Sequence, residues 1–258
     1  MKYRLLGKSG LRVSEAALGT MTFGDEWGWG SPKAEAQKVY ETYRQAGGNF
    51  LDTANFYTGG TSEKFLGEFI QGHRESVVLA TKYSNAAPGN DPNAAGNHRK
   101  NMMQAVEASL KRLQTDYIDL YWVHIWDGVT PVEEVMRGLD DLVRQGKVLY
   151  VGISDAPAWW VAQANTLAEL RGWTQFIGLR LEYSLIERTS CASTTLALIM
   201  SDTCFAQHAQ ILFLTRHGSR CDRRSTDKTR GACRKAPEAP LQTHSFGHNS
   251  ISAISFPD

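Results

Sequence analysis

Residues 106–124, VEASLKRLQTDYIDLYWVH, decide the fold, because they pass directly from an amphipathic helix into an apolar strand. Val106, Leu110 and Leu113 fall on one face of the expected helix, and YIDLYWVH is rich in aromatic and β-branched residues. The same alternation of helix and strand recurs along the chain at a spacing of roughly 30 residues. Repeated units of this kind predict an α/β protein with a parallel sheet.

Six apolar runs are expected to form the strands of this sheet. They are EAALGTM (15–21), NFLDTA (49–54), SVVLATKY (76–83), YIDLYWVH (117–124), VLYVGIS (148–154) and FIGLRLEY (176–183). Two further helical faces are predicted between them, one formed by Ala36, Val39, Tyr40 and Tyr43 and the other by Val135, Leu139, Leu142 and Val143. Near the start of the chain, YRLLG and LRVSE flank a KSG turn, which predicts a hairpin that closes the bottom of a barrel.

Six β/α repeats fit two architectures, an open doubly wound sheet and a (β/α)8 barrel. The first βα turn, GTMTFG, lacks the G-x-G-x-x-G fingerprint of a dinucleotide-binding open sheet, so we favour a TIM-type barrel with an N-terminal β-hairpin. Such a barrel needs two more repeats, and residues 190–258 offer only LALIM and ILFLT as strand-like runs. We therefore expect an incomplete barrel of six recognisable repeats in residues 1–189.

Residues 190–258 differ in composition from the rest of the chain. All four cysteines lie beyond residue 190, whereas every Trp and every Tyr lies before it. The segment is rich in Ser, Thr, Arg and His and has little periodicity, so we interpret it as an atypical polar tail, either disordered or encoded in a shifted reading frame. It contains Cys and His residues four apart but no C-x-x-C pair, and we predict no metal site.

Length and charge set broad limits on function. The chain has 258 residues, of which 42% are hydrophobic and 21% charged, and its formal net charge at pH 7 is +1. This balance gives no field that would attract nucleic acid or a membrane surface, and no apolar run suits a signal peptide or a membrane span. We expect a cytoplasmic protein that acts on a small molecule, and the sequence leaves its oligomeric state open.

Four polar residues stand at or just after the carboxyl ends of predicted strands. Asp52 ends NFLD, Tyr57 follows five residues later, Lys82 ends VVLATK and His124 ends YIDLYWVH. The active site of a (β/α)8 barrel lies at this end of its strands, so we expect the four residues to converge. Each alone has a structural explanation, such as a helix cap or a solvated lysine, but their combination favours a catalytic site.

These residue types suit the reduction of a carbonyl group, which takes a hydride on carbon and a proton on oxygen. A nicotinamide can supply the hydride and Tyr57 the proton. A tyrosine, with an ordinary pKa of about 10, is a reluctant acid at neutral pH, and a neighbouring ammonium favours its phenolate form. We assign that ammonium to Lys82, with Asp52 as its ion-pair partner and His124 as the group that orients the substrate oxygen.

Longer motifs around these residues carry a family resemblance. LDTANFYTGGTSEKFLG (51–67) fits D-x-A-x-x-Y followed by S-E-x-x-L-G, and SLKRLQTDYIDLYWVH (109–124) fits S-L-x-x-L-x-x-x-Y-I-D-L-x-x-x-H. With GKVLYVGIS (146–154), they make residues 2–188 resemble the aldo-keto reductase superfamily, in its bacterial aryl-alcohol-dehydrogenase-like and potassium-channel β-subunit-like branch. The resemblance implies an NADP-dependent oxidoreductase that reduces aldehydes or ketones to alcohols, with NAD as the alternative cofactor.

The resemblance also implies residues that contact the cofactor. They are Gly19, Thr20, Met21 and Asp52 near the nicotinamide and its ribose, Ser154 and Asp155 at the nicotinamide carboxamide, and Arg180 beside the nicotinamide. The family often has Asn at the position of Asp155 and usually Gln at that of Arg180. Since an ionised Asp only accepts hydrogen bonds and an Arg only donates them, we hypothesise that these two residues compensate each other as an ion pair.

A second function stays open because some family elements are not recognisable. After residue 189 the sequence has no W-S-P-L-like strand and no clear phosphate clamp. The alternative is a catalytically impaired, truncated reductase or a nucleotide-binding regulatory protein of the same fold. Binding of NADPH, followed by turnover of an aromatic aldehyde, separates the two.

Overall fold

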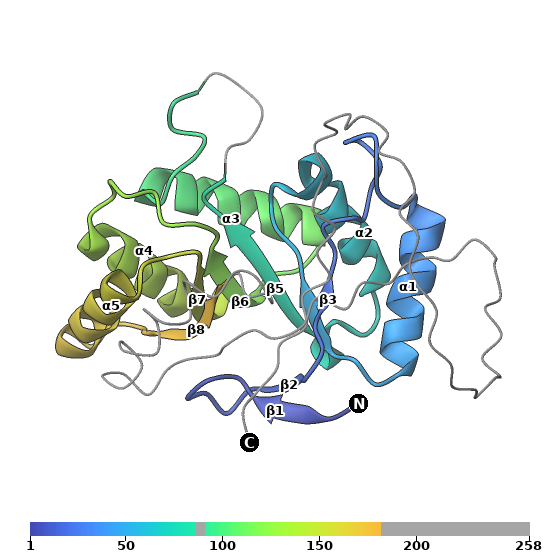
Figure 1. The fold of residues 1–258 in the computed structure, drawn as a ribbon, viewed down its shortest axis with the longest axis horizontal. Helices are drawn as coiled ribbons and strands as arrows, with labels where there is room; N and C mark the ends of the chain where they lie inside the picture. The colour runs from blue at the N-terminus through green and yellow to red at the C-terminus, as the bar shows by residue number, and fades with distance from the viewer. Residues whose placement is uncertain (86–90, 182–258) are drawn as a thin grey trace, which may run out of the picture.

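The computed structural model describes residues 1–85 and 91–181 (Figure 1). The predicted end of the barrel region at residue 189 and the polar tail at 190–258 lie outside these residues, as does the end of the sixth predicted strand. Within the described ranges, no helix has both the length and the apolar character needed to cross a membrane.

The described residues form two sheets. Strands β1 (Tyr3–Leu5) and β2 (Arg12–Ser14) pair antiparallel, as the predicted hairpin. The second sheet is parallel, with its strands side by side in chain order: β3 (Leu18–Gly19), β4 (Phe50–Asp52), β5 (Val78–Tyr83), β6 (Ile118–Val123), β7 (Val148–Ser154) and β8 (Phe176–Arg180). A doubly wound sheet changes direction at a switch point, whereas a (β/α)8 barrel keeps this order. The barrel prediction is confirmed, with six repeats in the described part.

Each strand from β3 to β7 is followed by a helix on the outer face of the sheet (Figure 1). The helices are α1 (Lys33–Gln45), α2 (Thr61–Phe69), α3 (Arg99–Leu113), α4 (Val132–Arg144) and α5 (Ala158–Arg171). Short 3-10 turns, η1 (Tyr57–Gly60) and η2 (Arg74–Ser76), lie in the connections. Strand β3 is shorter than predicted because the chain turns directly after it, where the Phe23 amide donates to the Thr20 carbonyl at 3.0 Å.

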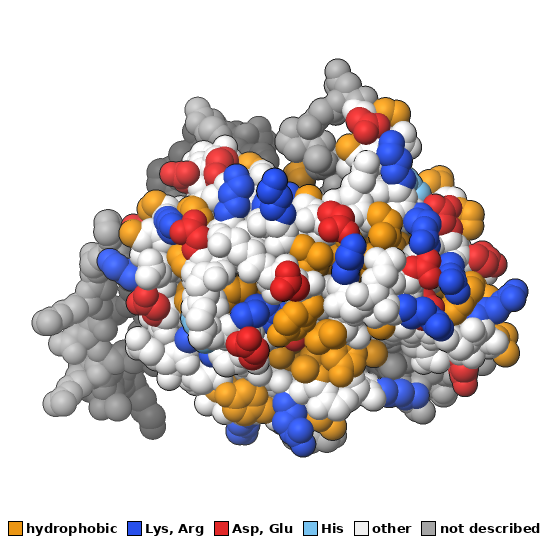
Figure 2. Space-filling model, turned by 180° about the vertical axis from the view of Figure 1, so that it is seen from behind, with side chains coloured by type: hydrophobic (Ala, Val, Ile, Leu, Met, Phe, Trp, Pro, Cys, Tyr) orange, Lys and Arg blue, Asp and Glu red, His pale blue; other side chains and the backbone are white. Residues whose placement is uncertain are grey.

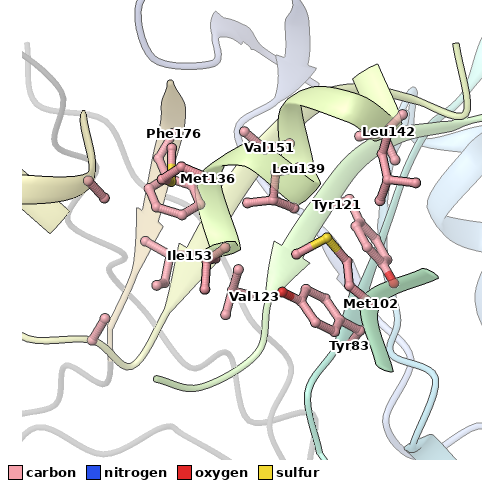
Figure 3. Close-up of a cluster of buried hydrophobic side chains, with 14 of the residues drawn as sticks. Tyr83, Met102, Tyr121, Val123, Met136, Leu139, Leu142, Val151, Ile153 and Phe176 are labelled. Atoms are coloured by element: carbon pink, nitrogen blue, oxygen red, sulfur yellow. The ribbon is translucent and has the colours of Figure 1, made fainter. Parts of the chain in front are cut away.

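The largest hydrophobic core lies between the sheet and helices α3, α4 and α5. Figure 3 shows its side chains from both layers: Tyr83, Met102, Tyr121, Val123, Met136, Leu139, Leu142, Val151, Ile153 and Phe176. The rings of Tyr83 and Tyr121 stack with their centroids 5.2 Å apart. Burial of this apolar layer fixes the helices on the sheet and so fixes where each strand ends.

The predicted helical faces are largely those that the structure buries. On α4, Val135, Leu139 and Leu142 are fully buried. On α1, Tyr40 is buried and packs against Phe69, but the prediction for Val39 was wrong, since it is 44% exposed. The apolar face of α1 is turned so that its Tyr40 edge packs against α2. Val39 lies at the other edge of that face and is therefore exposed.

A second cluster of buried residues fills the inside of the barrel. It comprises Leu6, Val13, Ala17, Phe50, Val78, Ala80, Leu120 and Trp122. Its hairpin members confirm that the N-terminal strands close this core. Because side chains alternate along a strand, the inward rows that contain Ala80 and Trp122 continue two residues later at Lys82 and His124. The pleat thus aims both polar residues into the barrel.

Surface charge is mixed rather than concentrated. On the face shown in Figure 2, Lys and Arg side chains alternate with Asp and Glu, and hydrophobic side chains lie between them. This pattern agrees with the net charge of +1.

Trp122 occupies a slot that two glycines leave open inside the barrel. A Cβ atom built on Gly152 would overlap Cε3 and Cζ3 of the Trp122 indole, and one built on Gly178 would lie 3.0 Å from its Cη2. We predict that Gly152→Ala lowers the free energy of unfolding by about 1–3 kcal/mol, because the indole must shift in a packed interior. Urea denaturation measures the change.

Gly10→Ala is the matched control, since a Cβ atom there meets nothing within 4 Å. Its free energy of unfolding should stay within about 0.5 kcal/mol of the parent. If Gly152→Ala and Gly10→Ala change the free energy of unfolding equally, the Trp122 indole does not depend on the space that Gly152 leaves open.

Candidate active site

The strands bring the predicted catalytic residues to one rim of the barrel. Asp52 is the last residue of β4, Lys82 is the second-last of β5, and His124 directly follows β6. Tyr57 begins η1, in the connection after β4. The end of one strand supplies the carboxylate, the next the ammonium and the third the imidazole, as the sequence predicted.

Lys82 is the centre of this group. Its side chain has no exposed surface, and its Nζ donates to Asp52 Oδ2 at 2.7 Å, to the Thr53 carbonyl at 2.7 Å and to the Tyr57 hydroxyl at 3.2 Å. An ammonium has three hydrogens, so all of its donors are used. A buried charge is tolerated only when it is paired and hydrogen-bonded in this way.

A strained turn holds the Tyr57 hydroxyl against Lys82. Thr58, Gly59 and Gly60 have φ angles of 48°, 62° and 94°, a left-handed run that ends η1 and starts α2. A non-glycine residue rarely adopts such a φ, and Thr58 is fixed by the hydrogen bond from its hydroxyl to the Phe23 carbonyl at 2.7 Å. The T-G-G sequence after Tyr57 therefore directs that side chain, which is 6% exposed, into the barrel mouth.

His124 lies edge-on to Tyr57, with the ring centroids 5.9 Å apart and the planes at 80°. Burial, and then the positive charges of Lys82 and Arg180, lower the pKa of His124 from 6.5 to about 2. Its Nδ1 is buried and has no hydrogen-bond partner among the described residues. The ring is therefore neutral at physiological pH and can orient an oxygen atom, but it is not a source of protons.

The residues expected beside the ribose are tied into the framework of the site. The Thr20 amide and hydroxyl both donate to the Asp52 carbonyl, at 3.0 and 3.2 Å. Thr20, Ser62 and Thr53 form a chain of hydroxyls, with oxygen–oxygen distances of 2.8 and 2.9 Å. Thr20 is fully buried, so its side chain locks β3, β4 and α2 together, a role that the sequence did not reveal. Its neighbours Gly19 and Met21 are buried and half-buried, respectively.

Ser154 and Asp155 lie together at the end of β7. The Ser154 hydroxyl is 3.3 Å from Asp155 Oδ2, and Ser154 is buried. Asp155 has a φ of 46°, and its amide donates to the Arg180 carbonyl at 3.0 Å. This pairing of β7 with β8 brings three of the predicted cofactor contacts to one side of the rim.

Arg180 has a partner that the sequence did not indicate. Its Nη1 lies 3.3 Å from Asp52 Oδ2, the oxygen that also binds Lys82. Burial alone would lower the pKa of Arg180, but the charges of Asp52, Tyr57 and Asp155 outweigh it and raise that pKa. The negative charge of Asp155 helps to raise the pKa of Arg180, as expected if the two side chains form an ion pair. The ion pair itself stays a prediction.

Aromatic side chains gather on both sides of the rim. Trp27 packs against Trp29 and Phe56, with ring centroids 5.3 and 5.6 Å apart, and Trp126 packs edge-on against Trp159 at 5.6 Å. Sequence reasoning missed Phe56, although its position next to Tyr57 was an available signal. A cavity of about 270 Å³ lies next to Trp27 and Phe56. It is lined by Trp27, Asn55, Phe56, Gly59, Asn85, Ala94, Asn101, Gln104, Ala105, Ala108 and Arg112.

Comparison with known proteins gives this geometry a family. The sequence profile of the Aldo/keto reductase family matches residues 16–201. That range contains all four residues of the predicted catalytic set.

Similar proteins include reductases and dehydrogenases. The chain is 46% identical over 187 residues to a norsolorinic acid reductase of Aspergillus flavus, an alignment that covers 67% of this chain and 48% of that protein. It is 50% identical over 178 residues to norsolorinic acid reductase stcV of Emericella nidulans, covering 65% and 46%. It is 45% identical over 193 residues to an aryl-alcohol dehydrogenase [NADP(+)] of Phanerodontia chrysosporium, covering 69% and 50%. The chain thus spans about half the length of the relatives it matches.

The low pKa of His124 predicts a dependence of stability on pH. The unfolded chain binds a proton at this residue below about pH 6.5, whereas the folded chain does not, so stability is lost as the pH falls below that value. Between pH 7 and pH 5, the parent should lose about 1–2 kcal/mol of unfolding free energy more than His124→Gln does. Urea denaturation of both proteins at the two pH values measures this difference. Parallel losses would mean that His124 is protonated in the folded chain.

Proposed function

Because the chain belongs to the Aldo/keto reductase family, we propose that it is an NADPH-dependent oxidoreductase that reduces the carbonyl group of a small molecule to an alcohol. The observation that carries this proposal is the position of Lys82 Nζ, 2.7 Å from Asp52 Oδ2 and 3.2 Å from the Tyr57 hydroxyl in a buried site. That arrangement equips a tyrosine for acid–base chemistry.

In this proposal Tyr57 is the general acid. Its hydroxyl gives a proton to the carbonyl oxygen of the substrate, and the phenolate that remains is stabilised by the Lys82 ammonium. Asp52 keeps Lys82 charged and in position, because the ion pair offsets the cost of burying the ammonium. In the reverse direction the phenolate takes the proton from an alcohol.

His124 has a different task, since its imidazole is neutral. A neutral imidazole carries one N–H, which can donate a hydrogen bond to the substrate oxygen and stabilise negative charge that develops there. The edge-on packing against Tyr57 keeps the ring near the atom that receives the proton. Proton transfer and substrate orientation thus belong to separate residues.

The residues at the ends of β7 and β8 fit a nicotinamide carboxamide. A carboxamide has one acceptor oxygen and an NH₂ donor, and the rim offers the Ser154 hydroxyl and the Arg180 guanidinium as donors and the Asp155 carboxylate as an acceptor. Gly19, Met21 and Asp52 would lie on the opposite side. When bound, the nicotinamide supplies the hydride.

The names of the relatives support NADPH and an aromatic substrate. One relative is named as an aryl-alcohol dehydrogenase with NADP(+), and others as norsolorinic acid reductases. The aromatic rings of Trp27 and Phe56 beside the Tyr57 turn would suit a planar substrate, so we propose an aromatic aldehyde or ketone and retain NAD as the alternative cofactor.

A second candidate is a nucleotide-binding protein of the same family without efficient turnover. It is favoured by the sequence of residues 190–258, which contains no recognisable phosphate clamp. Fluorescence titration with NADPH, followed by an assay with an aromatic aldehyde, separates the candidates. Binding without turnover selects the second, and absence of binding removes the reductase.

Tyr57→Phe tests the assigned general acid. The change deletes one hydroxyl from a buried ring, so we expect the rate of aldehyde reduction to fall by about 10²–10⁴-fold while NADPH affinity stays nearly unchanged. Steady-state kinetics and the fluorescence titration provide the two measurements.

Tyr43→Phe is the matched control, because that hydroxyl lies on the α1 side of the barrel and binds Ser14 and the carbonyls of Ala16 and Phe50. It should lower stability and leave the rate per folded molecule unchanged. Undiminished turnover in Tyr57→Phe would refute the role of Tyr57.

A further inference from the structure

The Arg180 side chain crosses the mouth of the barrel. It starts at the end of β8 and reaches Asp52 at the end of β4, although β5, β6 and β7 lie between these strands in the sheet. The two residues are 128 positions apart in the chain. An interaction over that span is made through the interior of the barrel and not along its wall.

Asp52 therefore holds two cations with one oxygen atom. Its Oδ2 accepts from Lys82 Nζ at 2.7 Å and from Arg180 Nη1 at 3.3 Å. Lys82 approaches from the neighbouring strand, and Arg180 approaches from across the barrel. The carboxylate is thus fixed from two directions, and with it the ammonium that touches Tyr57.

Arg180 also interacts with Tyr57. A side-chain hydrogen bond and the charge of Tyr57 are among the causes that raise the pKa of Arg180. Arg180 and Lys82 therefore both lie beside the Tyr57 hydroxyl.

We propose that Arg180 is a positioning residue of the reductase site, which braces the Asp52–Lys82 pair from across the barrel and adds a second positive charge beside the Tyr57 hydroxyl. The proposal rests on the proposed function in so far as Tyr57 is the proton donor. Its consequence is that the phenolate left after proton transfer is stabilised by two cations instead of one.

The titratable and charged groups around Arg180 and Tyr57 come from five elements of the barrel. They are Asp52 from β4, Lys82 from β5, the neutral His124 after β6, Asp155 after β7 and Arg180 from β8. Replacement of Arg180 by Gln removes one positive charge from this set and leaves two carboxylates against one ammonium. The phenolate should then form at a higher pH.

The test measures the Tyr57 phenolate directly. The chain has nine tyrosines, so the ultraviolet absorbance of each protein is titrated with pH and that of its Tyr57→Phe derivative is subtracted. We expect the midpoint of this difference signal to rise by about one pH unit in Arg180→Gln and to rise much less in Arg180→Lys, which keeps the charge. The pH at which oxidation of an aromatic alcohol is half-maximal should move in the same direction.

Arg137→Gln is the control for net charge. Arg137 pairs with Asp141 on α4, and its side chain is 51% exposed, away from the rim. This variant should leave both midpoints unchanged. If no protein turns over any substrate but the Tyr57 signal shifts as expected, the proposed function fails, whereas the effect of Arg180 on the Asp52–Lys82–Tyr57 group stands.

Two results would overturn the proposal. In the first, Arg180→Gln unfolds more easily but its Tyr57 signal coincides with that of the parent, which makes the bridge a structural tie only. In the second, Arg180→Gln binds NADPH more tightly with no shift of the Tyr57 signal, which makes Arg180 an obstacle in the cofactor site. If Arg180→Gln fails to fold, Arg180→Lys tests the proposal instead. This variant keeps the positive charge, so a rise of a full pH unit in its Tyr57 midpoint would contradict the proposal.

Discussion

The ion pair between Lys82 and Asp52 is the interaction on which the rest of the site depends. An ammonium with no exposed surface is unstable unless every hydrogen finds an acceptor, and the three acceptors come from Asp52, the Thr53 carbonyl and Tyr57. These acceptors come from the end of β4 and the turn that follows it, whereas Lys82 comes from the end of β5. A change in the register between β4 and β5, where Asp52 pairs with Ala80, would leave the charge unsatisfied. The parallel register thus places Asp52 beside Lys82, and the ion pair in turn favours that register.

The alternation of side chains along the strands explains why a hydrophobic interior ends in a polar rim. The inward rows of β5 and β6 place Val78 and Leu120 deep in the barrel, Ala80 and Trp122 above them, and Lys82 and His124 at the mouth. The bulky Trp122 fits because Gly152 and Gly178 have no side chains, and it occupies the inward position before His124 in the β6 row. The glycines of β7 and β8 thus serve the site although neither touches its polar atoms.

Sequence reasoning found the parts of the site that depend on local pattern. The order of strands and helices and the residues Asp52, Tyr57, Lys82 and His124 follow from periodicity and from the rule that barrel strands end at the active rim. The bridge from Arg180 to Asp52 did not follow, because it depends on the reach of a side chain across the barrel between residues 128 positions apart.

Properties that arise from burial were equally invisible in the sequence. The low pKa of His124 needs a buried imidazole beside two cations, and the hydroxyl chain of Thr20, Ser62 and Thr53 needs three elements in contact. The exposure of Val39 reflects how α1 turns toward α2, which periodicity alone does not determine. The predicted tail at 190–258 lies outside the described residues, so its interpretation stays a prediction. In the rim itself, burial, and then the positive charges of the two cations that bind Asp52, keep His124 neutral. In the proposed reaction, a neutral imidazole leaves the Tyr57 hydroxyl as the proton donor, so proton transfer and substrate orientation would belong to different residues.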